Sequence, residues 1–252
     1  MRVTFLGTGT SHGVPMIGCD CKVCHSTNPK NKRTRCSVYI EVENACLLID
    51  TPPDLRNQLL RENIRRIDAI LFTHAHADHL FGLDDIRRFN DINGANMPCF
   101  GLDETLSSIR RSFQYVFVPT QIGGGKPALD LIPVDGPFSA AAIPVIPIRV
   151  LHGKLDILGY RIGDFAYITD VSEIPSASLE LLFDLKVLVL GVIRHEPHET
   201  HFCLSQGIEM VEYLRPKRAY FTHIAHKLEH DTTNSILPPH IQLAYDGLKI
   251  DI

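Results

Sequence analysis

The chain has 252 residues, a formal net charge of -4 at pH 7 and 44% hydrophobic residues, enough to bury a large core without disulfides. Lysine and arginine are spread along the chain, which leaves no electrostatic footprint for nucleic acid. Seven cysteines without a secretory signal or a membrane-spanning apolar run favour reduced thiols and metal binding, so we expect a cytoplasmic protein with no nucleic-acid or membrane partner.

The first part of the chain predicts strands around a polar loop. Strands are expected at residues 3–6, 37–42 and 45–49, and the turn Gly-Thr-Gly-Thr at 7–10 leads into a polar segment that continues to about residue 35. A helix is expected at 54–66, because Pro52 and Pro53 suit a helix start. A short buried strand at 69–72 then leads directly into a cluster of histidines.

The rest of the chain mixes short strands with helices. Strands are expected at 98–100, 129–134, 143–151, 158–162, 166–168, 187–192, 219–221 and 248–252. Helices are expected at 104–113, 178–183 and 205–214, and the glycine run at 123–125 indicates a flexible loop. This pattern favours mixed sheets flanked by helices, so we expect an α/β (α+β) fold, an αββα sandwich, in a single domain covering residues 1–252.

The segment Thr73-His-Ala-His-Ala-Asp-His79 places four metal-binding side chains within six residues. In an extended chain His74 and His76 point the same way, because side-chain direction alternates. If a helix begins at Ala77, Asp78 and His79 reach a second point nearby, and the segment can hold two ions. Imidazole and carboxylate ligands suit Zn, Mn or Fe better than Ca or Mg. A functionless histidine-rich loop is the alternative, and the density of ligands argues against it.

This motif resembles the signature of the metallo-β-lactamase superfamily, and further matching positions follow in order along the chain. The resemblance implies that superfamily's four-layer fold and a two-metal hydrolytic site. It assigns His74, His76 and His152 to one metal, and Asp78, His79 and His223 to the other. Asp170 is assigned as the carboxylate between the two metals. Asp50 resembles the family aspartate that orients a ligand histidine through its free ring nitrogen.

Three cysteines, Cys19, Cys21 and Cys24, lie within six residues of the polar loop. Thiolates at this density in a reducing compartment most often hold zinc, with a fourth ligand from elsewhere, and redox-active cysteines are the alternative. Together with Gly-Thr-Gly-Thr-Ser-His-Gly-Val-Pro at 7–15, the pattern is similar to the PhnP-type cyclic phosphodiesterases of phosphonate breakdown. That resemblance implies a structural zinc in a loop at about residues 18–36, with His226 as the fourth ligand.

Together with the ligand set, this resemblance implies a metal-dependent phosphodiesterase with two divalent transition metals, Zn or Mn. These metals lower the pKa of a shared water and supply hydroxide for attack on a small phosphodiester, cyclic phosphates included. Asp78 is counted among the catalytic residues because it belongs to the central motif. His201, which precedes a helix, is expected by the resemblance to bind phosphate or act as a general acid; His198 competes for that role and His195 stays unassigned.

Other functions share much of this pattern. A thioester hydrolase has the same metal ligands, and so does a tRNA-processing nuclease, although no basic arm supports RNA binding. A non-enzymatic metal-binding or redox-regulatory protein would need only the cysteine loop. The expected partner is a small-molecule phosphodiester, and analogy within the fold allows a homodimer.

Overall fold

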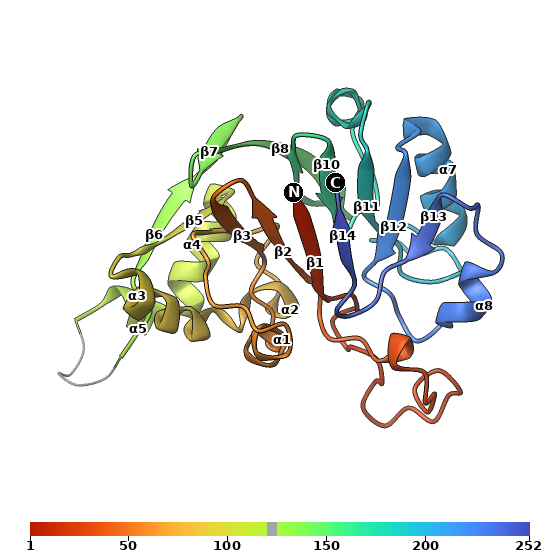
Figure 1. Ribbon diagram of the computed structural model, residues 1–252, viewed down its shortest axis with the longest axis horizontal. Coiled ribbons are helices and arrows are strands. Elements are labelled where there is room, and N and C mark those ends of the chain that lie inside the picture. Colours follow the sequence, from red (N-terminus) through yellow and green to blue (C-terminus); the bar gives the residue numbers. More distant parts are fainter. Residues whose placement is uncertain (120–124) are drawn as a thin grey trace.

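The computed structural model describes residues 1–119 and 125–252, and in this part of the chain two sheets of seven strands form the framework (Figure 1). The first sheet runs in the order β14 (Lys249–Asp251), β1 (Arg2–Gly7), β2 (Ser37–Val42), β3 (Ala45–Ile49), β4 (Ala69–Leu71), β5 (Met97–Gly101) and β6 (Leu129–Pro133). The second runs in the order β13 (Ile241–Leu243), β12 (Arg218–Thr222), β11 (Val187–Gly191), β10 (Phe165–Ile168), β9 (Leu155–Ile162), β8 (Ile143–His152) and β7 (Phe138–Ala140). Both sheets contain parallel and antiparallel pairs, as the pattern of connections predicted.

Helices pack on the outer side of each sheet (Figure 1). Beside the first sheet lie α1 (Leu55–Arg61), α2 (Ala77–Leu80), η2 (Leu83–Ile86), α3 (Arg87–Asn93), α4 (Asp103–Ser112) and α5 (Gln114–Phe117). The helices α6 (Ser176–Leu179), η3 (Glu180–Leu182), α7 (Leu204–Leu214) and α8 (His230–Asn234) follow strands of the second sheet, and η1 (Pro29–Asn31) lies in the polar loop. Among the described residues, no helix is both long and apolar enough to cross a membrane.

The core consists of three apolar layers, one between the sheets and one under the helices on each outer side. Strand β3 shows the reason: Leu47 and Ile49 pack between the sheets, whereas Leu48 faces the helices. In the second sheet, Tyr167 packs between the sheets and Ile168 faces α7 and its neighbours. Because both faces of the central strands are buried, the four-layer αββα arrangement is confirmed.

Several short elements depart from the expected pattern. The helix expected at 54–66 ends at Arg61, since Asn63 adopts a left-handed φ of 55° that a helix cannot continue through. The helix expected at 178–183 is instead α6 followed by the turn η3. No element was expected at 83–93, where η2 and α3 form, because runs this short carry too little periodicity to read. Of the expected glycine loop, Gly123 and Gly124 lie outside the described residues.

The polar loop between β1 and β2 lies against the segment that follows β12. The N–H of Ile224 donates to the carbonyl of Thr8 at 2.8 Å. Gly7 lets the two ends of the loop approach closely, because a β-carbon there would lie 1.9 Å from the Arg35 carbonyl oxygen. The carboxylate of Asp246 holds the two ends of the loop, because it accepts hydrogen bonds from the Thr8 hydroxyl and from the N–H and hydroxyl of Thr34. The loop is therefore held beside the carboxyl ends of the second sheet.

Candidate metal centre and substrate cavity

The candidate site lies where strands of both sheets end. In the first sheet, β4 leads into the histidine motif and α2, which together carry His74, His76, Asp78 and His79. In the second sheet, β8 ends at His152, and Asp170 and His223 follow β10 and β12. The structure brings these residues together, although they come from segments far apart in the sequence.

Three residues of the site have left-handed backbone conformations. The φ angles are 63° at Asp50, 51° at Asp170 and 59° at His223. Residues other than glycine adopt this conformation rarely, and such residues cluster at functional sites. Asp50 and His223 directly follow β3 and β12, and Asp170 follows β10 after one intervening residue, so the backbone turns where each strand ends.

The donor atoms form two groups that share Asp170. The groups are His74, His76, His152 and Asp170, and Asp78, His79, Asp170 and His223; within each group the ligand atoms lie within 4.8 Å of one another. Oδ2 of Asp170 is 3.8 Å from Nε2 of His74. Its Oδ1 is 3.4 Å from Nε2 of His79 and 3.2 Å from Nε2 of His223. One carboxylate oxygen thus faces each group, which suits a carboxylate placed between two cations.

Hydrogen bonds hold the outer nitrogen of two ligand-type histidines of the first group. Nδ1 of His152 donates to the carbonyl oxygen of Thr200 at 2.7 Å. Nδ1 of His74 donates to the hydroxyl of Thr73 at 3.0 Å. Each bond fixes the tautomer in which Nε2 carries no proton, and that is the nitrogen that can bind a metal.

Asp50 organises His79 in the same way. Its fully buried carboxylate accepts hydrogen bonds from Nδ1 of His79 and from the N–H and hydroxyl of Thr73, each at 2.8 Å. Burial raises the pKa of Asp50, although the bonds from His79 and Thr73 oppose that rise. Burial opposes a charge on His79 as well, but Asp170 and Asp50 raise its pKa well above the ordinary value.

The electrostatics of the cluster fit bound cations. Nε2 of His79 and both ring nitrogens of His223 are buried and have no hydrogen-bond partner among the described residues. Leaving such groups unsatisfied is costly, and a metal ion would satisfy Nε2 of both rings. Burial and His79 lower the pKa of His74 to well below its ordinary value, which keeps its ring in the neutral ligand form. The donor set, imidazoles with carboxylates, fits two divalent transition metals.

The cysteine loop forms a second cluster with His226. The Sγ atoms of Cys19, Cys21 and Cys24 lie 3.1, 3.5 and 3.5 Å from Nδ1 of His226. The N–H groups of Met16 and Cys24 donate to Sγ of Cys24 and Cys21, both at 3.4 Å. Three sulfurs converging on one imidazole nitrogen fit a tetrahedral zinc site. His226 lies three residues after His223, so one short segment joins the two clusters.

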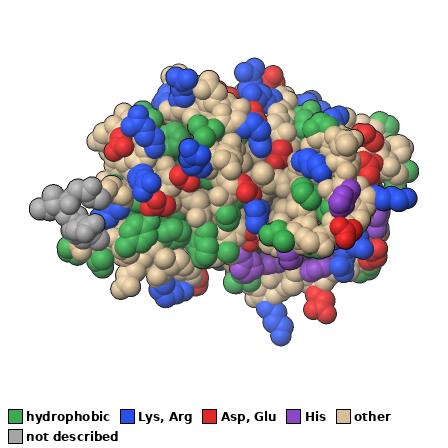
Figure 2. Space-filling view, turned by 90° about the horizontal axis from the view of Figure 1, so that it is seen from below, with side chains coloured by type: hydrophobic (Ala, Val, Ile, Leu, Met, Phe, Trp, Pro, Cys, Tyr) green, Lys and Arg blue, Asp and Glu red, His purple; other side chains and the backbone are tan. Residues whose placement is uncertain are grey.

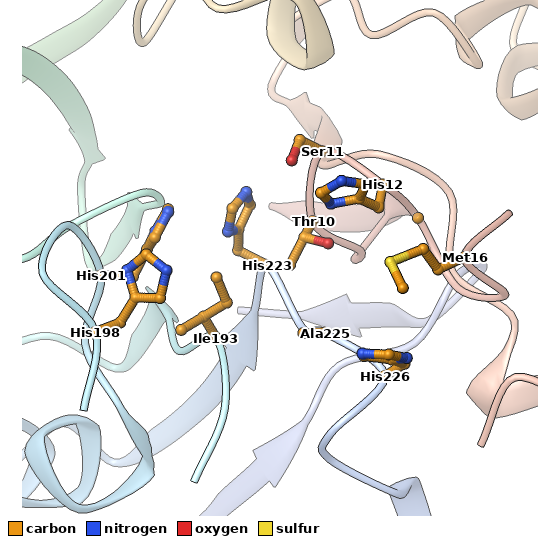
Figure 3. A pocket seen from close by; sticks show the side chains of 11 residues that line it. Thr10, Ser11, His12, Met16, Ile193, His198, His201, His223, Ala225 and His226 are labelled. Atoms are coloured by element: carbon orange, nitrogen blue, oxygen red, sulfur yellow. The ribbon is translucent and has the colours of Figure 1, made fainter. Parts of the chain in front are cut away.

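A cavity of about 350 Å³ opens beside His223, and histidines gather at the surface in this region (Figures 2 and 3). The ring of His201 stacks on that of His223 with centroids 4.8 Å apart. Burial and His223 lower the pKa of His201 to about 3, so its ring is neutral near pH 7. A neutral ring suits the expected phosphate-binding role better than the general-acid role. His198 also lines the cavity, whereas His195 is exposed and is not among its described lining residues.

The opposite wall of the cavity contains residues that sequence reasoning did not assign. Thr10, Ser11 and His12, from the polar loop, face His198 and His201 across the cavity (Figure 3). The segment at 7–15, which matches the PhnP-type pattern, contains them, but that match gave them no role. Thr73 and Thr200, which hold ligand-type histidines, were also missed, because their roles depend on backbone and side-chain atoms brought close by folding.

Comparisons with known proteins agree with the fold. Residues 46–224 match the family model described as a beta-lactamase superfamily domain. The crystal structure of a diphosphatase from the PhnP family is 44% identical, with 100% of this chain and 97% of that chain covered and a TM-score of 0.93. The octanoyltransferase of Porphyromonas gingivalis is 38% identical over 254 residues, covering 99% of this chain and 51% of that protein.

A ribonuclease Z of Limosilactobacillus reuteri is 30% identical over 174 residues, covering 65% of this chain and 49% of that protein. The chain therefore spans about half the length of these two curated relatives. The match to the superfamily domain and to the PhnP-family structure confirms the resemblance read from the motifs. The chain belongs to the beta-lactamase superfamily, and within it to the PhnP family.

Proposed function

We propose that this hydrolase of the beta-lactamase superfamily cleaves a small phosphodiester, with cyclic phosphates among the candidates, using two divalent transition metals, zinc or manganese. The observation that carries the proposal is the cavity of imidazole and hydroxyl groups beside the shared carboxylate of Asp170. None of the described residues that line this cavity is acidic, and N–H and O–H donors suit the anionic oxygens of a phosphate. The full-length similarity to a PhnP-family diphosphatase supports the same displacement at phosphorus.

In this proposal the side chains fall into two sets, those that would hold the metals and those that would bind the phosphate. When bound, the two metals would supply Lewis acidity at the phosphate and lower the pKa of a water. One metal would be held by His74, His76 and His152, and the other by Asp78, His79 and His223. Asp170 would lie between them. His201, neutral and stacked on His223, would donate an N–H to a non-bridging phosphate oxygen. Nδ1 of His198 accepts a hydrogen bond from the N–H of Thr200, which leaves its Nε2–H as a further donor.

The cysteine cluster would hold a structural zinc in this proposal. The three thiolates and His226 join the polar loop to the segment after β12, which also carries His223. Zinc there would keep the wall of the cavity in place without taking part in the reaction. None of the seven cysteines, all of which lie in the described part of the chain, forms a disulfide, and we propose a reducing compartment such as the cytoplasm.

Cleavage of a thioester is the second candidate, because the relative from Porphyromonas gingivalis is named an octanoyltransferase. This chain matches only about half of that protein, so the acyl transfer belongs to a longer chain. An octanoyl group also requires an extended apolar channel. The apolar side chains that line the cavity beside His223 are those of Met16, Ile193 and Ala225, and histidines and hydroxyls form most of the rest. The cavity therefore favours a phosphate over a long acyl chain.

Cleavage of RNA is supported by the ribonuclease Z relatives, of which this chain again covers about half or less. The net charge of -4 opposes it, because a long polyanion is bound mainly by clustered cations. Glu104 and Asp156 line a cavity beside His76, where their carboxylates would repel further phosphates of a strand. We therefore favour a small substrate.

The reaction class can be tested with bis(p-nitrophenyl) phosphate, an aryl thioester and a chromogenic β-lactam, each supplied to protein loaded with Zn or Mn. We expect turnover of the phosphodiester, loss of that turnover in Asp78→Ala, and retention of it in Asp84→Ala. Asp84 is a matched control because it is a surface aspartate paired with Arg87, away from the donor groups. Thioester cleavage without phosphodiester turnover in metal-loaded protein would refute the proposal.

A further inference from the structure

A separate cavity of about 390 Å³ lies where the polar loop meets the C-terminal part of the chain (Figure 1). We call it the His230 cavity; residues of η1, α8, β13 and the segments that flank β13 line it. No described residue lines both this cavity and the one beside His223. Its volume falls in the range of pockets that hold small molecules.

Hydrogen bonds between these elements hold the walls of the His230 cavity in place. The N–H of His230 donates to the side-chain oxygen of Asn31 in η1 at 2.8 Å. Asn234 joins α8 to β13, because its side-chain oxygen accepts from the N–H of Leu243 at 2.8 Å. The NH2 group of Asn234 donates to the carbonyl of His230 at 2.9 Å. The cavity is therefore preformed, which lowers the entropic cost of binding a ligand.

The ring of His230 offers this cavity one hydrogen-bond donor. His230 is only 3% exposed, and Nη2 of Arg33 lies 3.2 Å from its Nδ1. Because a guanidinium can only donate, Nδ1 is the acceptor in this bond. Burial and Arg33 lower the pKa of His230 to about 4, so the ring is neutral near pH 7 and its one proton lies on Nε2. Nε2 has no hydrogen-bond partner among the described residues.

A cation and apolar side chains line the same cavity. Nζ of Lys30 lies 5.0 Å from the centre of the Tyr245 ring, and the His230 ring packs against that ring edge to face at 5.7 Å. Within the described residues, Nζ of Lys30 forms no hydrogen bond or ion pair. The apolar side chains of the lining are those of Leu237, Pro238, Pro239, Ile241, Leu243 and Leu248. The cavity thus combines an N–H donor, an ammonium group and an apolar surface.

We propose that the His230 cavity is a second binding site of this protein and that its ligand is a small carboxylate with an apolar body, such as an aromatic acid. The carboxylate would accept a hydrogen bond from Nε2 of His230 and pair with Nζ of Lys30, and the apolar body would pack on the aliphatic lining. A phosphate dianion fits less well, because the exposed carboxylate of Asp231 also lines the cavity and repels a second negative charge. The inference does not depend on the reaction at the metal centre, since the two cavities share no lining residue.

Calorimetry on metal-loaded protein tests the proposal with benzoate, benzamide, acetate and phenyl phosphate as probes. Benzoate and benzamide have nearly the same shape and differ in charge, acetate lacks the apolar body, and phenyl phosphate carries a second negative charge. The site variants are Lys30→Met, His230→Met and His230→Gln. Lys186→Met is the matched control, because Lys186 is an exposed lysine that pairs with Asp164 and does not line the cavity.

A hydrogen bond to a charged group changes affinity by roughly tenfold or more, so we expect wild type to bind benzoate about tenfold more tightly than benzamide. Acetate and phenyl phosphate should also bind more weakly than benzoate. In Lys30→Met and His230→Met the preference for benzoate over benzamide should fall to within about threefold of unity. His230→Gln keeps an acceptor for Arg33 and an N–H for the ligand, and should recover part of the preference. Lys186→Met should keep the wild-type preference.

Amide hydrogen exchange locates the bound probe without any substitution. Benzoate should slow exchange in wild-type peptides that cover residues 28–34 and 230–245, which contain the lining residues of η1, α8 and β13. Slower exchange only in peptides that contain the metal-binding histidines would place benzoate at the metals and refute the proposal.

Other results would overturn it as well. Equal affinities of wild type for benzoate and benzamide, or tighter binding of phenyl phosphate than of benzoate, would show that the cavity does not select a carboxylate. If Lys30→Met keeps the wild-type preference, the ammonium plays no part; this variant changes a side chain of the polar loop outside the core, so it remains informative if His230→Met fails to fold. If Lys186→Met loses the preference as fully as Lys30→Met, net charge rather than this cavity controls binding. None of these results bears on the phosphodiesterase proposal, which the substrate panel tests separately.

Discussion

Replacing Asp50 with asparagine tests how far the metal centre depends on a side chain outside the donor groups. The carboxylate of Asp50 accepts three hydrogen bonds at 2.8 Å, from Nδ1 of His79 and from the N–H and hydroxyl of Thr73. Asparagine keeps the shape and tolerates the left-handed φ of 63° at this position, so backbone strain adds nothing to the effect. The change therefore isolates the charge and the second acceptor oxygen.

The expected magnitude follows from these bonds. An asparagine oxygen in the place of Oδ2 can keep the bonds from His79 and the Thr73 hydroxyl, but its NH2 group then faces the N–H of Thr73. A buried donor without an acceptor costs about 1–3 kcal/mol. Because burial raises the pKa of Asp50, removal of its charge recovers some desolvation energy, and we expect a loss near the lower end, about 1–2 kcal/mol. Loss of the anionic partner of a ligand histidine lowers metal affinity by roughly 10- to 100-fold.

Two measurements separate these effects. Urea unfolding of metal-free protein gives the free energy of unfolding, and competition with a chromophoric chelator gives the affinity for zinc. Asp246→Asn is the matched control, because the Asp246 carboxylate also accepts three hydrogen bonds, from Thr8 and Thr34, but belongs to neither donor group. We expect both variants to lose stability and only Asp50→Asn to lose metal affinity. Zinc affinity in Asp50→Asn within about threefold of wild type would refute the role of Asp50.

Three further outcomes are expected. His201→Ala should lower kcat for an aryl phosphodiester by roughly 10²- to 10³-fold and His198→Ala by clearly less, because His201 stacks directly on His223; equal losses in steady-state kinetics would contradict this order. Cys21→Ser should lower the metal content by one ion per chain and lower the Tm, since the other donor groups keep their ligands; elemental analysis that finds unchanged metal content would show that the cysteine cluster holds none. Burial and Arg33 lower the pKa of His230 from 6.5 to about 4, so the unfolded chain takes up the proton at a higher pH than the folded chain. The contribution of the neutral His230 ring to stability is therefore complete above pH 6.5 and is lost as the pH falls toward 4. Urea unfolding of metal-free protein at several pH values in this range should show a smaller acid-induced loss in His230→Asn than in wild type, and identical losses would contradict the assignment.

The sequence by itself determined the features that depend on neighbours along the chain. The apolar strands could be predicted because both faces of a central strand are buried. The motif His74-x-His76-x-Asp78-His79 could be recognised because its ligands lie within six residues. Alternating side-chain direction followed by a helical turn predicts two donor points from this segment alone, and α2 begins at Ala77 as that reading required. The cysteine loop could be recognised for the same reason, because its three cysteines also lie within six residues.

Other residues could be named only through the family resemblance. His152, Asp170, His223 and His226 are isolated polar residues in the sequence, and nothing local distinguishes them from surface side chains. The structure places them at or just after strand ends, beside the motif or the cysteine loop. The short elements η2, α3, α8 and β13 were missed because tertiary packing, rather than local periodicity, stabilises elements of this length.

Only the tertiary structure determined which side chains of the site come into contact with one another. That Asp170 faces both donor groups, that Thr73 links Asp50 to His74, and that His12 lies across a cavity from His201 are facts about distances between segments remote in sequence. Hydrogen bonds and burial act over a few ångströms, and chain folding alone determines which groups come within that range. The sequence therefore determines which functional groups are available. Their protonation states, hydrogen-bond partners and access to substrate are determined only when the two sheets pack together.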